Sequence, residues 1–274
     1  MTDTTLRKIR TVQYRKNMEY TIEQIQEFRK CADPVTGPEY FLTNYFMIQH
    51  PVSGPQLMQM QQYHLDFLHN IHSNQQSINL LSRQLGKTTL MTGYALWMAL
   101  FCDDSTIVFA AAKNAIGKDM MQRLYFALAN LPEFLRCDTF SQIKTYVHFH
   151  NGSRIMSSVV SANTGRGMSI SLLMIDEFAY VRSDVAAEFI ASVWPALSFF
   201  GKVVIASSLS SSENVFNTLW EDANNKTNAM SPFAADWRVN LDLDESWEKD
   251  MTKVIGREAF SREYLNKVAE PADA

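Results

Sequence analysis

The sequence predicts an α/β fold with a mainly parallel central sheet flanked by helices. Short apolar runs that fit buried strands alternate with segments of helical spacing. The expected strands are residues 77–81, 106–112, 172–175 and 202–208, and the expected helices are 88–101, 114–131 and about 183–193. This alternation favours parallel pairing, because each helix returns the chain to the edge of the sheet where the previous strand began.

Composition limits the possible function classes before any motif is considered. The chain has 274 residues and 46% hydrophobic residues, enough for one large domain or two smaller ones with a sizeable core. Its formal net charge of −4 provides no global positive field, so contacts with nucleic-acid phosphates must come from local patches. Cys31, Cys102 and Cys137 lack CxxC spacing, which favours packing roles for reduced thiols over a zinc site.

The sequence shows neither a membrane span nor a secretory signal. Its longest apolar stretch, about 90–102, falls short of the ~20 residues that cross a bilayer. The basic N-terminus has no apolar run behind it. We therefore expect no membrane partner and a protein that stays in the cytoplasm where it is made.

Turn signals and helical patterns divide the chain into three parts. Residues 1–57 are expected to be mainly helical up to Arg29 and then to pass through Pro- and Gly-rich turns. A core follows over 58–213, and helices return over 214–274. The two ends are expected to form one small helical lid subdomain, with the linker at the C-terminal end.

Within the expected core, residues 146–160 fit a hairpin at one edge of the sheet. The run splits at Asn151-Gly152 into two strand-like halves, and Asn-Gly is a strong signal for a tight hairpin turn.

A phosphate-binding loop is indicated at the end of the first expected strand. The segment Leu81-Ser82-Arg83-Gln84-Leu85-Gly86-Lys87-Thr88 matches GxxxxGK[ST], with Leu81 at the place of the first glycine. In such a loop Gly86 lets backbone N–H groups face a triphosphate, Lys87 meets the β and γ oxygens, and Thr88 offers a hydroxyl to Mg²⁺. The alternative is a chance Gly-Lys-Thr at a strand–helix turn.

An acidic pair follows a second apolar strand about ninety residues downstream. Asp176 at the strand end is suited to hold Mg²⁺, and Glu177 to polarise the water that attacks the γ-phosphate. A solvated strand end is the alternative for this pair alone. Together with the Gly-Lys-Thr loop, the pair predicts a P-loop NTPase of the additional-strand, catalytic-glutamate class.

The segments SRQLGKTT, MIDEFA and Thr164-Gly165-Arg166-Gly167 resemble the ATPase half of the large terminase subunit of tailed bacteriophages, the motor that packages DNA into capsids. The resemblance runs from about Tyr63 to Ser208, and the loop without its first glycine is a specific mark of that family. It implies ATP and Mg²⁺ as ligands and double-stranded DNA, a portal protein and a small terminase subunit as partners. It also implies a homo-oligomeric ring at the procapsid portal in the host cytoplasm.

The resemblance also assigns individual roles. Glu177 and Arg83 would be catalytic, and Arg166 would reach ATP on a neighbouring subunit as an arginine finger, with a carboxylate or DNA-phosphate partner as its alternative. Thr88 and Asp176 would hold Mg²⁺. His64 replaces a glutamine of the family pattern, which leaves recognition of adenine by a side-chain amide open. The nucleotide contacts expected are Gln62, Tyr63, Ser82, Arg83, Gln84, Gly86, Lys87, Thr88, Thr89, Ser207 and Ser208.

Family members typically carry a C-terminal nuclease domain, and the sequence favours no nuclease activity for this chain. Its late carboxylates are interpreted as solvated surface, because the several strands that a nuclease metal site needs are not predicted around them. These residues are Asp236, Asp242, Asp244 and Glu245.

Other polar residues favour ordinary structural roles. His148 and His150 share a strand face without a third ligand at metal spacing. Lys113, Lys118 and Arg123 are compatible with DNA phosphates or with a solvated helix face. Two rival functions remain open: a helicase or other nucleic-acid-dependent translocase, and a non-hydrolysing nucleotide-binding scaffold.

Overall fold

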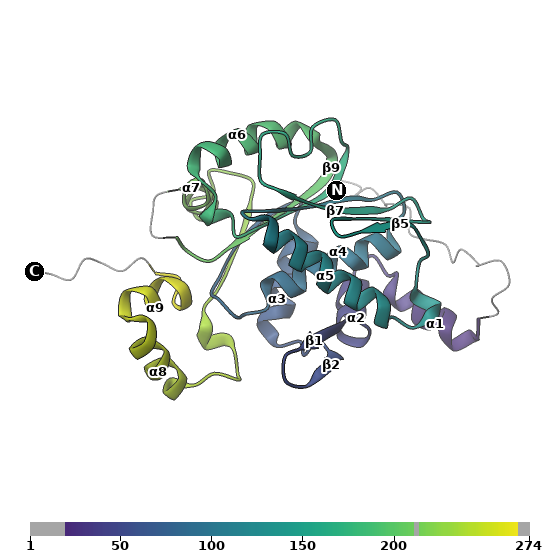
Figure 1. The fold of residues 1–274 in the computed structure, drawn as a ribbon, viewed down its shortest axis with the longest axis horizontal. Helices are drawn as coiled ribbons and strands as arrows, with labels where there is room; N and C mark the ends of the chain where they lie inside the picture. The colour runs from purple at the N-terminus through teal and green to yellow at the C-terminus, as the bar shows by residue number, and fades with distance from the viewer. Residues whose placement is uncertain (1–19, 211–213, 268–274) are drawn as a thin grey trace, which may run out of the picture.

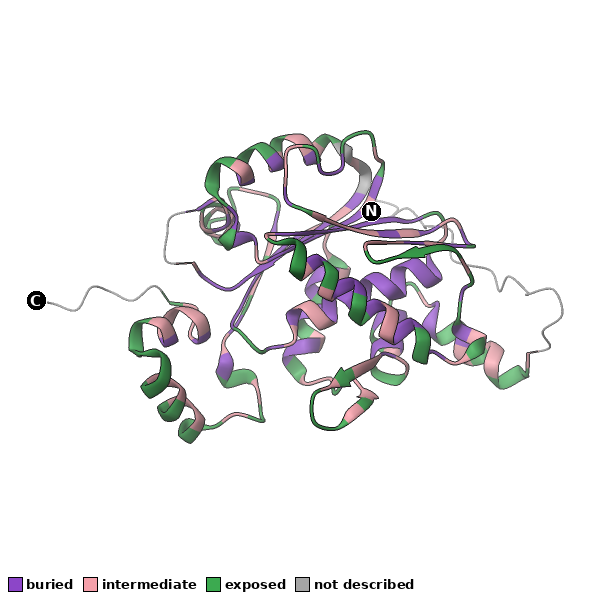
Figure 2. Ribbon diagram, in the orientation of Figure 1, coloured by how far each residue is buried: buried purple, intermediate pink, exposed green. Residues whose placement is uncertain are grey.

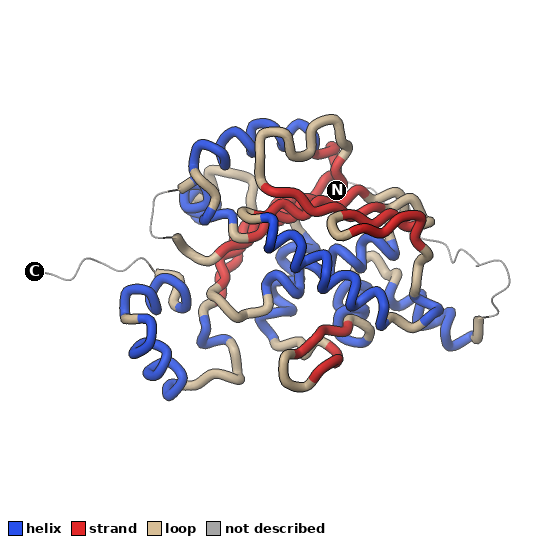
Figure 3. Tube along the Cα trace, viewed as in Figure 1, coloured by secondary structure: helices blue, strands red, loops and turns tan. Residues whose placement is uncertain are grey.

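The computed structural model describes residues 20–210 and 214–267. Within them the strands form an eight-stranded sheet in the order β10-β3-β9-β8-β4-β7-β6-β5 and a separate hairpin of β1 and β2 (Figure 3). The strands are β1 (Met47–His50), β2 (Gly54–Leu57), β3 (Gln76–Leu81), β4 (Thr106–Ala111), β5 (Thr139–Ile143), β6 (Tyr146–Phe149), β7 (Arg154–Val159), β8 (Ile170–Asp176), β9 (Leu197–Ser207) and β10 (Ser231–Ala235).

The predicted parallel sheet is confirmed, and its order is informative. All neighbouring pairs from β10 to β7 are parallel, and the two pairs at the other edge, β7–β6 and β6–β5, are antiparallel. β9 lies between β3 and β8, so the P-loop strand and the strand that ends in Asp176 are separated by an additional strand, as the sequence predicts. The carboxyl ends of the parallel strands meet at one edge, where ligands bind in sheets of this type.

Helices cover both faces of the sheet. In Figure 1, α2, α3, α4 and α5 lie on one side and α6 and α7 on the other. The helices are α1 (Ile22–Cys31), α2 (Gly37–Asn44), α3 (Gln62–Ser73), α4 (Lys87–Phe101), α5 (Asn114–Asn130), α6 (Ser183–Val193), α7 (Val215–Asn224), α8 (Glu245–Ile255) and α9 (Arg257–Tyr264). No described helix has the length and apolar character needed to cross a bilayer.

Alternating side chains of the strands supply two cores. In β4, Ile107 and Phe109 pack with the α1–α5 side, whereas Val108 and Ala110 pack with the α6–α7 side. Because both faces are covered, all of β4 is buried, and the central strands are coloured as buried in Figure 2. This burial explains why the expected strands are continuous apolar runs.

A glycine in α4 lets α2 approach closely. A Cβ at Gly93 would lie 2.3 Å from Leu42 Cδ2 and 3.0 Å from Phe46 Cε1. A side chain of any size at this position would push the two helices apart.

The two chain ends occupy different places. α1 and α2 share the large core with α4, whereas α8 and α9 pack around Trp237, Phe260 and Tyr264. Figure 1 shows α1 and α8–α9 toward opposite ends of the long axis. The described parts of the two ends therefore do not lie together as one lid. The domain boundaries at 57/58 and 213/214 remain a prediction. Residues 1–19 lie outside the described residues.

The hairpin predicted around Asn151-Gly152 is present as β6 and β7, with β7 also pairing with β4. Four strands were not predicted from the sequence: β1, β2, β5 and β10. β10 contains Pro232, which lowers strand propensity but is tolerated because β10 is an edge strand. The first three missed strands are short and mostly exposed or half-buried, so they carry little apolar periodicity.

Candidate active site

The Gly-Lys-Thr loop joins β3 to α4 at the carboxyl edge of the sheet. Leu81, at the place of the missing first glycine, is fully buried and pairs with Ala235 of β10 as part of β3. The turn begins one residue later, and Gln84 and Gly86 have positive φ values of 66° and 68°. Leucine fits the first position because a strand residue needs no positive φ.

Gly86 is required by its backbone conformation and by a close neighbour. A Cβ at this position would lie 3.2 Å from Nε2 of His64, which belongs to α3. The Nδ1 atom of His64 accepts a hydrogen bond from the Gln61 N–H at 3.0 Å. Burial lowers the pKa of His64 to about 4. A hydrogen bond to the Leu85 backbone acts in the opposite direction, because it favours the charged form, but burial has the larger effect. The imidazole is therefore neutral at pH 7 and supports the loop.

Lys87 and Glu177 form an ion pair across the site, with Nζ and Oε1 separated by 2.5 Å. The Lys87 side chain is only 8% exposed. Burial opposes its charge, but the carboxylates of Glu177 and Asp176 outweigh burial and raise the pKa of Lys87. The P-loop cation is thus charged and faces the predicted catalytic base.

Thr88 and Asp176 form the second contact between the two motifs. The Thr88 hydroxyl donates to Oδ2 of Asp176 at 2.6 Å, and Asp176 is fully buried. Burial raises the pKa of Asp176, although Lys87 acts in the opposite direction. One hydroxyl and one carboxylate fit Mg²⁺, which takes few protein ligands and completes its shell with water and phosphate oxygens.

Two further oxygens at the site lack hydrogen-bond partners among the described residues. They are Ser82 Oγ in the loop and Glu177 Oε2, and both are buried. Glu177 also has a φ of 57°, unusual for a residue with a side chain, and its N–H donates to Asp176 Oδ1 at 3.0 Å. Unpaired buried polar atoms next to a strained acidic residue fit a site built for a polar ligand.

Ser207 and Ser208 connect the end of β9 to the segment after Glu177. The Ala179 N–H donates to Ser207 Oγ at 3.1 Å, and Ser208 Oγ lies 3.1 Å from the Tyr180 hydroxyl. Both serines are fully buried. Their hydroxyls are therefore engaged within the protein, and contact with phosphate remains a prediction for both.

Glu263 of α9 is a site residue that sequence reasoning missed. Its Oε2 lies 2.8 Å from Arg83 Nε, and its carbonyl oxygen accepts from the Arg83 N–H at 3.0 Å. Its carboxylate also accepts from the Tyr180 hydroxyl at 3.2 Å and from Ser208 Oγ at 3.4 Å. Glu263 thus joins three segments around the site to α9. Nothing in the REYL sequence distinguishes it from a surface glutamate.

The two nucleotide contacts predicted on α3, Tyr63 and Gln62, have different surroundings. Tyr63 is 6% exposed, and burial raises its pKa to about 12. Gln62 is exposed and its amide donates to Asp66 at 2.9 Å on the same helix. It is Gln61 that reaches across to the chain before α8, where its amide contacts Asp242 at 3.1 Å. The roles of Tyr63 and Gln62 remain predictions.

Arg166 lies in the turn between β7 and β8. It is exposed, and its backbone N–H closes the turn by donating to Asn163 at 3.4 Å. The structure does not bring it to the Lys87–Glu177 pair through any described hydrogen bond or ion pair. An exposed arginine is compatible with a site on a second subunit, which remains a prediction.

The late carboxylates have local partners in the structure. Asp236 caps the helical turn at Trp237–Val239 by accepting from the Arg238 N–H, and Asp244 caps α8 by accepting from the Trp247 N–H. Asp242 meets Gln61, and Glu245 begins α8. Capping accounts for two of the four without a metal.

The structure also gives the surroundings of the histidine and the cations that the sequence assigns to ordinary structural roles. His150 stacks on Phe140 of the neighbouring strand, with ring centroids 3.9 Å apart. Lys113 and Lys118 are exposed at the start of α5. Arg123 is paired with Asp119.

Comparison with known families matches residues 78–269 to the family described as the terminase large subunit, T4likevirus-type, N-terminal part. This segment contains the P-loop, Asp176, Glu177 and Glu263, and it covers more than half of the chain.

Solved structures with the same fold include large terminases. The ATPase domain of the Thermus phage P74-26 large terminase superposes with a TM-score of 0.64 at 18% identity, over 84% of this chain and 98% of that one. The bacteriophage HK97 large terminase gives a TM-score of 0.65 at 16% identity, over 83% of this chain and 54% of that one. A large terminase from a thermophilic bacteriophage, solved with ADP, gives 0.60 at 14% identity, over 76% of this chain and 53% of that one. The chain thus spans about half of the latter two proteins.

Proposed function

The chain belongs to the terminase large subunit family of the T4-like type, in its N-terminal part, and from this we propose that it is a Mg²⁺-dependent ATPase that drives double-stranded viral DNA into a capsid. The observation that carries the proposal is the meeting of two motifs ninety residues apart. Lys87 contacts Glu177, and Thr88 contacts Asp176, at the carboxyl edge of the parallel sheet.

The paired charges suggest how these residues act on ATP. A triphosphate at the start of α4 competes with Glu177 for the Lys87 ammonium, because the phosphate oxygens carry more negative charge than one carboxylate. Glu177 is then free to accept a proton from the attacking water. Mg²⁺ held through Thr88 and Asp176 would neutralise charge on the phosphate oxygens. Lys87 and the amide groups at the start of α4 orient the substrate.

The family also suggests the partners. We expect double-stranded DNA as the transported substrate, a portal protein and a small terminase subunit as contacts, and a ring of identical subunits in the host cytoplasm. The exposure of Arg166 between β7 and β8 supports a role for it on a neighbouring subunit of such a ring. We expect no nuclease activity from the described part of the chain.

The first test compares hydrolysis with nucleotide binding. Lys87→Ala and Glu177→Gln are both expected to lower phosphate release by at least ~10²-fold, the scale of a lost catalytic group. Glu177→Gln should still bind a fluorescent ATP analogue, because Glu177 acts on water rather than on ground-state phosphates, whereas Lys87→Ala should bind it poorly. Glu188→Gln and Lys249→Ala, at exposed positions on α6 and α8, are the matched controls.

Several outcomes would contradict the proposal. Wild-type turnover by Glu177→Gln would remove the glutamate from catalysis. Nucleotide binding without phosphate release by the wild-type chain would favour a scaffold. DNA-stimulated hydrolysis accompanied by strand separation would favour a helicase over a packaging motor.

A further inference from the structure

The turn that follows α9 lies against the end of the P-loop strand. α9 ends at Tyr264, and Asn266, two residues later, has a φ of 53°. Asparagine is one of the few residues with a side chain that adopt this left-handed conformation readily. The Lys267 N–H then donates to the Ser261 carbonyl at 3.1 Å and closes the helix end. The backbone at 266 therefore favours asparagine, aspartate or glycine.

The side-chain amide of Asn266 joins β10 and β3 beside the loop. Its Nδ2 donates to the Ala235 carbonyl of β10 at 2.8 Å and lies 3.4 Å from the Leu80 carbonyl of β3. The Ala235 carbonyl also accepts from the N–H of Ser82, the residue that follows β3, at 3.0 Å. One backbone oxygen thus receives both the loop and Asn266. Aspartate and glycine cannot replace this contact, because neither offers a side-chain donor at neutral pH.

The loop conformation needs support from outside the loop. Gln84 has a φ of 66°, which is unfavourable for a residue with a side chain and persists only where the surroundings hold it. The Arg83 N–H donates to the Glu263 carbonyl of α9 at 3.0 Å, and the preceding N–H donates to β10. The start of the loop is therefore fixed to α9 and to β10, the two segments that Asn266 connects.

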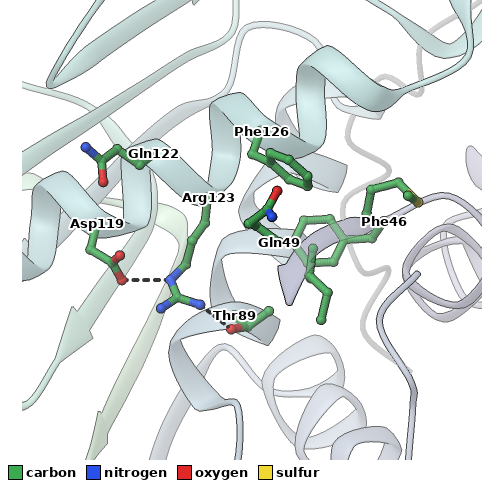
Figure 4. Close-up of a pocket in the computed structure, with 9 residues that line it drawn as sticks. Phe46, Gln49, Thr89, Asp119, Gln122, Arg123 and Phe126 are labelled. Atoms are coloured by element: carbon green, nitrogen blue, oxygen red, sulfur yellow. Dashed lines mark hydrogen bonds and ion pairs between the residues drawn. The ribbon is translucent and has the colours of Figure 1, made fainter. Parts of the chain in front are cut away.

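A contact from α5 reaches the other end of the loop. Arg123 Nη1 donates to the Thr89 hydroxyl in the first turn of α4 at 2.9 Å, beside a cavity of about 380 Å³ (Figure 4). The Arg123 side chain is 45% exposed and also pairs with Asp119. Contacts of exposed charged side chains contribute little to stability. The part of the loop before Gly86 thus depends mainly on the contacts from α9 and the turn after it.

We propose that Asn266 is a positioning residue for the P-loop. Its amide holds the end of α9 against β10 and thereby presets residues 82–86 in the conformation that receives phosphates. The inference rests on the proposed function, because it assigns the loop to a nucleotide. Loss of the amide lowers the fraction of molecules whose loop is ready to bind, and the apparent affinity falls by the same factor. Turnover at saturating ATP stays unchanged, because bound nucleotide then holds the loop.

The test removes the amide while the backbone conformation is kept. Asn266→Gly retains the left-handed turn without a donor. Asn266→Asp retains the size of the side chain but directs a carboxylate at two carbonyl oxygens. Lys226→Gly, at an exposed position with a φ of 59° after α7, is the control for an added glycine. Lys267→Ala, at the exposed neighbouring residue, is the control for a change in the same turn.

The Asn266 variants should change nucleotide affinity and leave turnover unchanged. Binding of a fluorescent ATP analogue is expected to weaken about fivefold in Asn266→Gly, the effect of losing one ordinary hydrogen bond, and further in Asn266→Asp. Phosphate release at saturating ATP should match the wild type. Hydrogen exchange of residues 82–86 should be faster in the nucleotide-free variants and return to the wild-type rate with saturating analogue. Both lysine variants should match the wild type throughout.

Wild-type affinity in both Asn266 variants would overturn the inference. A lower urea midpoint without a change in affinity would also overturn it, because Asn266 would then contribute to stability alone. Equal weakening in Lys226→Gly would do the same, since an added glycine would account for the effect. A wild-type chain that binds no ATP analogue would instead overturn the proposed function itself.

Discussion

Arg83 of the P-loop and Glu263 of α9 are joined twice, through their backbones at 3.0 Å and through Nε and Oε2 at 2.8 Å. Glu263 is 14% exposed, whereas Arg83 is 55% exposed. The same carboxylate accepts from Tyr180 and Ser208. The position of α9 is thus linked to the P-loop and to the ends of β8 and β9.

Replacing Glu263 by alanine is expected to lower the free energy of unfolding by ~1–2 kcal/mol. Most of this loss should come from the hydrogen bonds that the Glu263 carboxylate accepts from the Tyr180 and Ser208 hydroxyls. The ion pair with the half-exposed Arg83 contributes little. Hydrogen exchange of α9 should accelerate in the variant. Glu258→Ala, at an exposed position on the same helix, is the control. Equal stability and exchange in the two variants would show that α9 is held without Glu263.

Gly86→Ala is expected to abolish detectable ATP binding while the chain remains folded. The φ of 68° costs a side-chain-bearing residue ~1 kcal/mol or more, and the new Cβ would crowd His64 Nε2 at 3.2 Å. Relief of this crowding should shift the loop. Circular dichroism would verify folding, and fluorescence with an ATP analogue would measure binding. Binding close to the wild-type level would mean that the loop tolerates the shift.

His64 should make stability depend on pH between about 6.5 and 4. The folded pKa of about 4 lies below the ordinary histidine pKa of 6.5, so the unfolded chain binds the extra proton first as the pH falls. The stabilisation is complete above pH 6.5 and is lost toward pH 4, by at most about 3 kcal/mol. Urea unfolding at pH 7.5, 5.5 and 4.5 should show a shallower pH dependence for His64→Gln. Parallel curves for the two proteins would refute this assignment.

Mixing Arg166→Ala with Glu177→Gln should restore part of the ATPase activity that each variant lacks. A finger acting on a neighbouring subunit leaves some mixed interfaces with both an intact arginine and an intact glutamate. The measurement is phosphate release at concentrations where sedimentation shows mixed oligomers. Absence of recovery under those conditions would assign Arg166 a role within its own subunit.

Local patterns predicted much of the fold and named the central site residues. The motifs at 81–88 and 172–177 mark strand ends, and parallel pairing brings those ends to one edge of the sheet. The structure places Lys87 against Glu177 and Thr88 against Asp176, while their catalytic roles remain predictions. Gln62 shows the limit of such patterns. Its place on α3 follows from the sequence, but its side-chain amide donates to Asp66 one turn along the helix, a contact that was not predicted.

The sequence alone determined the strand–helix alternation and the phosphate-binding loop, because apolar periodicity and a Gly-Lys-Thr turn are properties of a few neighbouring residues. Only the tertiary structure decided that β10 completes the sheet beside β3, that Glu263 holds Arg83, and that Arg123 meets Thr89 at a cavity. These contacts join residues that lie between 34 and 180 positions apart. Packing of whole elements sets which of many similar polar residues meet, and no local pattern encodes that choice.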